Sequence, residues 1–429
     1  MTSFGSDLIL ARLRRLHPKA IDLSLDRMWR ILAALDHPER LLAPVVHIAG
    51  TNGKGSTLAF LDAMLRSRGL RTQRYVSPHL VHFNERILFD GEPIDEEALA
   101  QALDVAERAN QGAPITEFEI TTAAAFVAFA ARPADALLIE TGLGGRLDAT
   151  NVFEAPGLCA LSPISLDHQG FLGETIEQIA FEKAGILKPG VRAVVGPQRP
   201  DALAVIERQA LRVGAPLLIH GHDWAVKAAG ERFIVASAMG PVELPAPALV
   251  GRHQFDNAGL AVMLGRLFEP QLGSTDIESG LSTARWPARL QRLTGGALLD
   301  GLYGSGIEVW LDGGHNPAAG EALAVSMAGD TRPLTLIVGM LKTKDLSGFL
   351  APLSRVAAAL IAVPVPDEPA SRAPDEIVHD GRKLGLPSAG AADVQDALAM
   401  LRERGRSGRV LICGSLYLAG AVLRANQTS

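Results

Sequence analysis

The chain has 429 residues, of which 48% are hydrophobic and 21% charged, and its formal net charge is −6 at pH 7. This length is enough for two or three domains, and the composition is typical of a soluble globular protein rather than a disordered one. The acidic balance argues against a global basic field that would attract nucleic acid. No apolar run approaches the roughly 20 residues of a membrane span, so we expect neither a nucleic-acid nor a membrane partner.

The two cysteines, Cys159 and Cys413, are both flanked by apolar residues. Isolated thiols of this kind are typical of a reducing compartment and of buried small hydrophobes, not of a disulfide framework or a metal cluster. The N-terminal segment lacks the continuous apolar core of a signal peptide. The sequence therefore predicts a cytoplasmic protein, and we expect a monomer.

Short apolar runs alternate with helical patterns along most of the chain, which predicts α/β units around a mainly parallel sheet. In the first part we expect strands over residues 45–48, 74–76, 136–139, 158–161 and 191–195, and helices over 56–68, 95–109 and 121–131. Residues 233–248 are Gly/Pro-rich and predict a hairpin or an irregular cover, and a helix is expected over 257–267. A second alternation has strands over 309–311, 334–338, 359–363 and 410–412. A domain boundary, and a candidate hinge, is expected in the run 286–292.

A glycine-rich turn follows the first predicted strand and leads into a predicted helix; it reads Gly50-Thr51-Asn52-Gly53-Lys54-Gly55-Ser56. Successive N–H groups in such a turn form a nest for an anion, the helix N-terminus adds partial positive charge, and Lys54 adds a full charge. The turn departs from the strict phosphate-loop pattern, because Ile48 stands at its first glycine and Gly55 follows the lysine. A plain glycine-rich turn is the alternative, but the strand, turn and helix together favour a nucleotide-phosphate site.

The second chemical signal is Glu140, which ends the predicted strand 136–139 and precedes a glycine-rich run, Gly142-Leu143-Gly144-Gly145. A carboxylate in this position is what a nucleotide enzyme needs to hold Mg²⁺ beside the phosphates. An acid that merely ends a strand is the alternative. Because the G-x-G-x-x-G spacing of a dinucleotide site is absent, we reject NAD as a cofactor.

Other polar residues follow predicted strands, where open α/β sheets bind their ligands. Each has an ordinary alternative: a Ser-Pro turn for Ser77, a weak Mg²⁺ ligand for the imidazole of His168, and a capped turn for Asp312 and His315. Lys183 by itself is typical of a solvated helix surface. The residues alone therefore leave these four positions and Lys183 open.

Taken together, these stretches resemble the folylpolyglutamate synthase/dihydrofolate synthase family, within the wider class of ATP-dependent Mur ligases. The resembling pieces are residues 47–56, 77–80 with 85–86, 140–151, 167–168 with 172–173, 182–186, 312–317 and 414–417. The resemblance implies an α/β fold: a P-loop ATPase domain with a mainly parallel sheet, residues 1–288, followed by a smaller Rossmann-like domain, residues 289–429. Gly314 stands where the family usually has alanine.

The resemblance also implies roles for individual residues. Lys183 is implied to be carbamylated by CO₂, which turns a cation into an anionic oxygen donor. The implied ATP-binding residues are Gly50, Thr51, Asn52, Gly53, Lys54, Gly55, Ser56, Asn257, Arg289 and Asp312, and the implied ligands of two Mg²⁺ ions are Ser77, Glu140, His168 and Lys183. The implied catalytic residues are Lys54, Lys183, His315 and Arg289, and the implied substrate-binding residues are Asp22, Phe118, Asp148 and Ser415.

The implied reaction is ATP-dependent amide-bond formation between L-glutamate and a folate-type carboxylate through an acyl phosphate. We expect a bifunctional enzyme that accepts both dihydropteroate and tetrahydrofolate, and a monofunctional folylpolyglutamate synthase is the alternative. A Mur-type ligase acting on a UDP-linked precursor is disfavoured, because the 44 residues before Val45 are too few for a separate UDP-binding domain. A P-loop switch ATPase is disfavoured by the acid, the imidazole and the polar cluster of the second domain.

Overall fold

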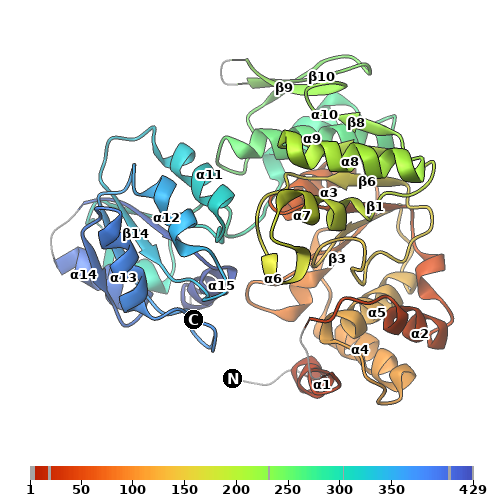
Figure 1. Ribbon diagram of the computed structural model, residues 1–429, viewed down its shortest axis with the longest axis horizontal. Helices are drawn as coiled ribbons and strands as arrows, with labels where there is room; N and C mark the ends of the chain where they lie inside the picture. Colours follow the sequence, from red (N-terminus) through yellow and green to blue (C-terminus); the bar gives the residue numbers. More distant parts are fainter. Residues whose placement is uncertain (1–4, 18–20, 230–231, 303, 404–406, 428–429) are drawn as a thin grey trace. The chain divides into compact units, whose positions relative to one another are not determined.

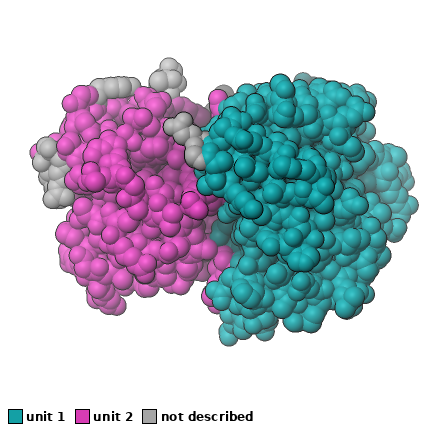
Figure 2. All heavy atoms as spheres, turned by 90° about the horizontal axis from the view of Figure 1, so that it is seen from above, with its two compact units in different colours: residues 1–164, 172–248, 255–284 teal, residues 165–171, 249–254, 285–429 magenta. Residues whose placement is uncertain are grey.

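The computed structural model describes residues 5–17, 21–229, 232–302, 304–403 and 407–427 (Figure 1). The chain forms two compact units (Figure 2). Unit 1 contains residues 1–164, 172–248 and 255–284, and unit 2 contains residues 165–171, 249–254 and 285–429. Unit 2 thus includes two short segments, 165–171 and 249–254, that interrupt the sequence of unit 1. The long run of unit 2 begins four residues before the expected boundary at 288/289.

Unit 1 is built on an eight-stranded sheet in the order β4-β3-β2-β5-β1-β6-β7-β8. The six strands from β2 to β8 in this order are parallel, whereas β3 and β4 are antiparallel additions at one edge. The strands are β1 (Val45–Ala49), β2 (Thr72–Tyr75), β3 (Ile87–Phe89), β4 (Glu92–Pro93), β5 (Ala136–Glu140), β6 (Leu158–Leu161), β7 (Ala193–Val195) and β8 (Leu217–Ile219).

The centre of this sheet explains why its strands could be found from the sequence. Every residue of β1, β5 and β6 is buried. Parallel strands covered on both faces need continuous apolar runs rather than alternation. One core cluster includes residues of α2, α4 and α5, and another includes residues of α7 and α8.

The helices of unit 1 flank this sheet, and α1, α2, α4 and α5 pack against one another (Figure 1). Their bounds are α1 (Gly5–Leu13), α2 (Asp26–Ala34), α3 (Lys54–Ser67), α4 (Glu96–Asn110), α5 (Glu117–Ala130), α7 (Ile176–Ala184), α8 (Pro200–Val213) and α10 (Ser274–Thr283). The helix α9 (His253–Phe268) begins in unit 2 and continues in unit 1, and α6 (Gln169–Leu172) ends at the change from unit 2 to unit 1. The short 3₁₀ helices are η1 (Pro38–Leu41) and η2 (Phe83–Arg86).

A small antiparallel sheet, β11-β10-β9, belongs to unit 1. The expected hairpin over 233–248 is the pair β10 (Arg232–Ser237) and β11 (Val242–Pro245). The third strand, β9 (Trp224–Ala229), was not expected from the sequence.

Unit 2 contains a six-stranded sheet in the order β12-β13-β17-β14-β15-β16, in which only β12 is antiparallel to its neighbour. Its strands are β12 (Gln291–Leu293), β13 (Ile307–Leu311), β14 (Leu334–Val338), β15 (Ala359–Ala362), β16 (Ser388–Gly390) and β17 (Gly408–Cys413). Its helices are α11 (Pro317–Met327), α12 (Leu346–Leu353), α13 (Pro374–Lys383), α14 (Val394–Glu403) and α15 (Leu416–Ala425), with the 3₁₀ helix η3 (Ala297–Leu302). The predicted fold class is confirmed: a large, mainly parallel α/β unit is followed by a second α/β unit.

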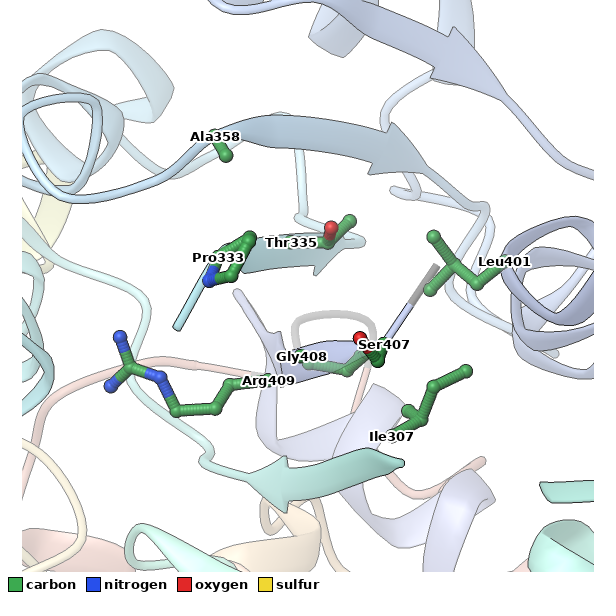
Figure 3. Close-up of a pocket in the computed structure, with 9 residues that line it drawn as sticks. Ile307, Pro333, Thr335, Ala358, Leu401, Ser407, Gly408 and Arg409 are labelled. Atoms are coloured by element: carbon green, nitrogen blue, oxygen red, sulfur yellow. The ribbon is translucent and has the colours of Figure 1, made fainter. Parts of the chain in front are cut away.

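A pocket of about 350 Å³ lies at the amino edge of the unit-2 sheet (Figure 3). Ile307 and Gly408 begin β13 and β17, and both line it. Arg409, which also lines it, donates to the backbone carbonyls of Met327, Asp330 and Arg332. Because these bonds engage its guanidinium with the end of α11 and the segment before β14, we assign the pocket no ligand.

No helix in the part of the chain that the structure describes has the length and apolar character needed to cross a membrane.

Candidate active site

The glycine-rich turn lies between β1 and α3, at the carboxyl edge of the unit-1 sheet. Gly53 is the residue before α3, with φ of 88°, and Lys54 is the first residue of the helix. The N–H groups of Thr51 and Asn52 both donate to the carbonyl of Pro163, at 2.9 and 3.2 Å. These two N–H groups are therefore engaged within the protein. The first N–H groups of a helix have no carbonyl partner inside the helix, so the predicted anion nest reduces to Gly53 and the first turn of α3.

Two glycines of this turn allow neighbouring elements to approach closely. A Cβ added at Gly50 would lie 1.9 Å from Oγ of Ser162, which follows β6. A Cβ added at Gly53 would lie 2.3 Å from Oδ1 of Asn257, and the positive φ of Gly53 is itself unfavourable for other residues. Asn257 on α9 therefore contacts the turn at which the nucleotide is expected.

Lys54 and Lys183 meet at one carbonyl oxygen. Nζ of Lys183 donates to the carbonyl of Gly50 at 2.8 Å, and Nζ of Lys54 donates to the same oxygen at 3.1 Å. Lys183 is on α7 and is only 5% exposed, so it is not the solvated surface lysine that its pattern indicated. Nζ of Lys54 also lies 3.5 Å from Oε1 of Glu140. The loop lysine, the buried lysine and the strand-ending acid thus converge on the start of the turn.

Glu140 ends β5, which lies between β2 and β1 in the sheet, and the residue is 6% exposed. Ser77 comes two residues after β2, and its peptide bond to Pro78 is cis. Ser77 and Glu140 therefore follow adjacent parallel strands at the same edge. Three of the four predicted metal ligands, Ser77, Glu140 and Lys183, belong to unit 1, whereas His168 belongs to the segment 165–171 of unit 2.

The donor set in unit 1 is compatible with Mg²⁺. No group of three or more His, Cys, Asp or Glu side chains arranged to hold a metal occurs among the described residues. Mg²⁺ differs from metals that need such a cage, because proteins hold it with one or two carboxylates, waters and substrate phosphates. The single buried carboxylate of Glu140, beside a turn suited to phosphate, fits this mode of binding.

The loop after Glu140 is fixed by a buried polar network. Asp148 accepts from the N–H of Leu143 at 2.7 Å, and from the N–H and hydroxyl of Thr150 at 3.0 and 2.5 Å. Because the Thr150 hydroxyl donates to Asp148, it accepts from Nε2 of His47 at 2.9 Å. Burial lowers the pKa of His47 to about 3, so this imidazole is neutral, and burial raises the pKa of Asp148. The carboxylate of Asp148 already accepts hydrogen bonds from its own loop. A contact between Asp148 and the folate-type substrate would therefore use the lone pairs that remain on its two oxygens.

Phe118 packs against the same loop. A Cβ added at Gly142 would lie 2.3 Å from Cζ of Phe118, and the Phe118 ring centroid lies 6.3 Å from that of Tyr75. Phe118 is in the first turn of α5. The contact with Gly142 therefore places Phe118 directly against the loop that follows Glu140. Asp22, another predicted substrate contact, lies in the segment before α2, and its side chain is 35% exposed.

We predict that Gly142→Ala destabilises the protein. The added methyl group overlaps Phe118, and overpacking of a packed site typically costs about 1–3 kcal/mol. Chemical unfolding of the two proteins measures the difference. Gly170→Ala is the control, because nothing lies within 4 Å of a Cβ at that position, and its effect is expected to stay within about 0.5 kcal/mol. Equal stability of Gly142→Ala and the unaltered protein would contradict the contact.

In unit 2, Asp312 organises the turn after β13. Its Oδ2 accepts from the N–H of Leu290 at 2.7 Å and its Oδ1 accepts from the N–H of Gly314 at 2.6 Å. Arg289 is close, since a Cβ at Gly313 would lie 3.0 Å from its Nη1. A Cβ at Gly314 would lie 2.8 Å from Oδ1 of Asp312, so the glycine here makes room for the aspartate. Arg289 and Asp312 are thus brought together in unit 2.

Asp167 forms a cluster of polar contacts in unit 2. Its Oδ1 lies 2.5 Å from Nζ of Lys344, and its Oδ2 accepts from Nδ2 of Asn316 at 3.1 Å and lies 3.4 Å from Nε2 of His315. The same Nζ lies 3.4 Å from Nε2 of His168. Although burial opposes ionisation, the hydrogen bond from His315 and the charges of His315 and Lys344 keep the pKa of Asp167 well below its usual value. This cluster holds the segment 165–171 in unit 2.

Three residues of this cluster have no role assigned from the sequence: Asp167, Asn316 and Lys344. Lys344 lies in the run Thr343-Lys344-Asp345, which resembles a guanine-specificity motif only superficially, because the aspartate comes one residue too early. It follows β14, so the rule that sites lie beyond strand ends could have found it. Asp167 belongs to the resembling piece 167–168, to which the resemblance gives a role only at His168. Ser415, a predicted substrate contact, accepts from the N–H groups of Tyr417 and Leu418 as the N-cap of α15.

With this geometry described, comparison with known proteins decides the family. A model described as "Dihydrofolate synthetase, C-terminal domain" matches residues 298–425. A dihydrofolate synthase/folylpolyglutamate synthase of Bacillus subtilis (strain 168) is 36% identical over 415 residues, which cover 92% of each chain. The chain belongs to the folylpolyglutamate synthase/dihydrofolate synthase family.

Solved structures of similar proteins extend the likeness over the whole fold. Escherichia coli FolC in complex with DHPP and ADP has a TM-score of 0.87, 30% identity, and coverage of 99% of this chain and 97% of that one. A bifunctional folylpolyglutamate synthase/dihydrofolate synthase with Mn, AMPPNP and L-glutamate bound has a TM-score of 0.86, 29% identity, and coverage of 99% and 98%. The predicted family and enzyme class, an ATP-dependent ligase, are confirmed.

Proposed function

We propose that this folylpolyglutamate synthase/dihydrofolate synthase family member is bifunctional and joins L-glutamate to both dihydropteroate and tetrahydrofolate. The observation that carries the ATP-dependent step is the convergence of Lys54, Lys183 and Glu140 on the turn between β1 and α3. The bound molecules named for the similar structures support the substrate classes: DHPP and ADP in one, and Mn, AMPPNP and L-glutamate in the other. A monofunctional folylpolyglutamate synthase is the alternative that the experiment below separates.

In the proposed reaction, the γ-phosphoryl group of ATP passes to the acceptor carboxylate, and the α-amine of L-glutamate then displaces phosphate from the acyl phosphate. Phosphoryl transfer depends on positioning and charge neutralisation more than on covalent help from the protein. Lys54 supplies a cation at the turn, and the N-terminus of α3 supplies partial positive charge. We assign Arg289 a second cationic contact to the nucleotide and Asp312 and Asn257 contacts to its ribose and adenine.

The proposed metal residues are Glu140, Ser77, His168 and Lys183. Mg²⁺ bound there supplies neutralisation of the β- and γ-phosphates. We propose that Lys183 is carbamylated and that two metal ions bind. The support is its burial next to the turn, where an added carboxylate would be an oxygen donor beside Glu140. His315 and Ser415 are proposed on the amino-acid side, and Asp22, Phe118 and Asp148 on the acceptor side.

The test is phosphate release from Mg-ATP with L-glutamate, measured with dihydropteroate, with tetrahydrofolate and without acceptor. Release with both acceptors, together with products heavier by glutamyl units in mass spectrometry, is the expected result. Release with tetrahydrofolate alone would replace the bifunctional assignment by the monofunctional one. Release that is independent of any acceptor would overturn the ligase assignment in favour of a bare ATPase.

We further propose a cytoplasmic monomer. The two cysteines, Cys159 and Cys413, are free and buried in the structure, and Sγ of Cys159 donates to the carbonyl of Ile186. Unpaired buried thiols are typical of reducing compartments and support this placement.

A further inference from the structure

Arg27 on α2 binds two acidic residues that come from different parts of unit 1. Its Nε donates to both carboxylate oxygens of Glu119, at 2.9 and 3.2 Å. Its Nη1 donates to Oδ2 of Asp22 at 2.9 Å, and its Nη2 donates to the carbonyl of Asp22 at 2.6 Å. One guanidinium group therefore ties the segment before α2 to the first turn of α5.

The α5 end of this connection is rigid. Glu119 is 4% exposed, and its Oε2 also accepts from the N–H of Thr116 at 2.8 Å and from the Thr116 hydroxyl at 2.9 Å. These bonds form a capping box at the start of α5, which fixes the direction in which the helix begins. A planar guanidinium bound to two oxygens of a buried carboxylate has a defined orientation, which lysine cannot reproduce.

Arg27 connects two residues that are related to the proposed acceptor site. Asp22 is itself a proposed contact to the acceptor substrate, and Glu119 is next in sequence to another such contact, Phe118. Glu119 directly follows Phe118, whose ring packs on Gly142 and lies near Tyr75. Asp22 is a proposed acceptor contact, and its partly exposed carboxylate reaches solvent. Arg27 itself has 19% side-chain exposure and directs its donors at Asp22 and Glu119. It is therefore placed to act on the acceptor through other residues.

We propose that Arg27 is a positioning residue of the acceptor site, which holds Asp22 at a fixed place relative to Phe118. This rests on the proposed function, because that function is what makes Asp22 and Phe118 acceptor contacts. Loss of Arg27 frees the segment before α2 while the capping box of α5 persists. Binding of the pterin-bearing acceptor weakens, whereas ATP and L-glutamate are bound by other residues and are unaffected.

Arg27→Met is the test variant, and Arg30→Met is its matched control. Arg30 lies one turn further along α2 and also attaches the helix to its surroundings, through Nη2 donating to Oδ1 of Asn110 at 3.1 Å and to the carbonyl of Pro114 at 2.9 Å. The KM values for acceptor, ATP and L-glutamate are measured for both variants. For Arg27→Met, we expect the acceptor KM to rise by about tenfold or more, as misplacement of a contact does, while the other two KM values stay within about twofold. Arg30→Met is expected to leave the acceptor KM unchanged.

A conservative variant guards against misfolding of Arg27→Met. Arg27→Lys keeps the charge, but its single ammonium cannot bind Glu119 and Asp22 together in the observed geometry, so the acceptor KM should again rise at an unchanged melting temperature. Wild-type kinetics in Arg27→Lys, equal acceptor KM values in Arg27→Met and Arg30→Met, or equal losses for all three substrates would each overturn the inference while the proposed function stands. A wild-type enzyme that shows no acceptor-dependent phosphate release would overturn the proposed function and the inference together.

Discussion

Lys183→Ala is expected to lose ligase turnover by on the order of 10²-fold or more, which is the scale at which losses around a metal site are measured. In the proposed enzyme the carbamate of Lys183 contributes an anionic oxygen donor to the metal. The alanine variant removes that donor and leaves a space next to the carbonyl of Gly50. Formate or acetate in the buffer should occupy this space and restore part of the activity, which is measured as phosphate release against carboxylate concentration.

Lys54→Ala is the matched control for the rescue. Lys54 donates to the same Gly50 carbonyl as Lys183, but its proposed role is that of a cation beside the phosphates. An added carboxylate cannot replace a cation, so Lys54→Ala should be inactive and should stay inactive in formate. Wild-type activity in Lys183→Ala would refute the carbamate, and equal rescue of both variants would show that the carboxylate acts elsewhere.

The central part of the fold could be predicted because its strands carry their own signal. β1, β5 and β6 are buried throughout and are almost entirely apolar, as buried parallel strands require, with His47 in β1 and Glu140 at the end of β5 as the polar residues. β9 and β12 could not be predicted in this way. β9 mixes one buried residue with exposed and half-buried ones, and β12 is three residues long. A strand at the edge of a sheet is defined by the partner with which it pairs rather than by its own pattern.

The candidate site residues likewise fall into those with a local sequence signal and those without one. The rule that ligands bind beyond strand ends singles out Lys54, Glu140 and Asp312 as candidates, because each position is local to one strand and its turn. The sequence does not single out Lys344 and Arg27, because their contacts are with acidic residues far away in the sequence: Asp167 is 177 positions from Lys344, and Glu119 is 92 positions from Arg27. No periodicity encodes such a pair, since only the folded chain brings its members together.

The hydrogen bonds of the turn 50–56 also could not be predicted from its local sequence. The motif predicted that the N–H groups of the whole turn 50–56 face a phosphate. In the structure, the carbonyl of Pro163 accepts from two of them, those of Thr51 and Asn52. Pro163 follows β6, which is adjacent to β1 in the sheet. The backbone partner that narrows the nest thus comes from a segment more than a hundred residues away, and a local motif contains no information about it.

Glu140→Gln should raise the Mg²⁺ concentration needed for half-maximal turnover by about tenfold or more, because loss of one metal-site group typically costs 10–100-fold in metal affinity. Glutamine has the same shape as glutamate but carries no charge, and one neutral amide oxygen is a weaker ligand for a hard cation than a carboxylate. Mn²⁺ binding followed by electron paramagnetic resonance, with a non-hydrolysable ATP analogue and no turnover, gives a readout independent of activity. The melting temperature checks that the variant is folded. We expect it to be unchanged, because Lys54 keeps its hydrogen bond to the carbonyl of Gly50 when Glu140, 3.5 Å from its Nζ, loses its charge.

Asp148→Asn is the control for Glu140→Gln, because Asp148 is a buried acid in the same region that is not a proposed metal ligand. Asp148 lies in the loop after Glu140 and is 2% exposed, but its oxygens are bonded to Leu143 and Thr150. We expect Asp148→Asn to lower stability, because the amide N–H₂ takes the place of one of the two carboxylate oxygens, each of which accepts from a backbone N–H group. Its Mn²⁺ affinity should equal that of the wild type. If Glu140→Gln also binds Mn²⁺ with wild-type affinity, Glu140 is not a ligand, and its role reduces to the charge that it places 3.5 Å from Lys54.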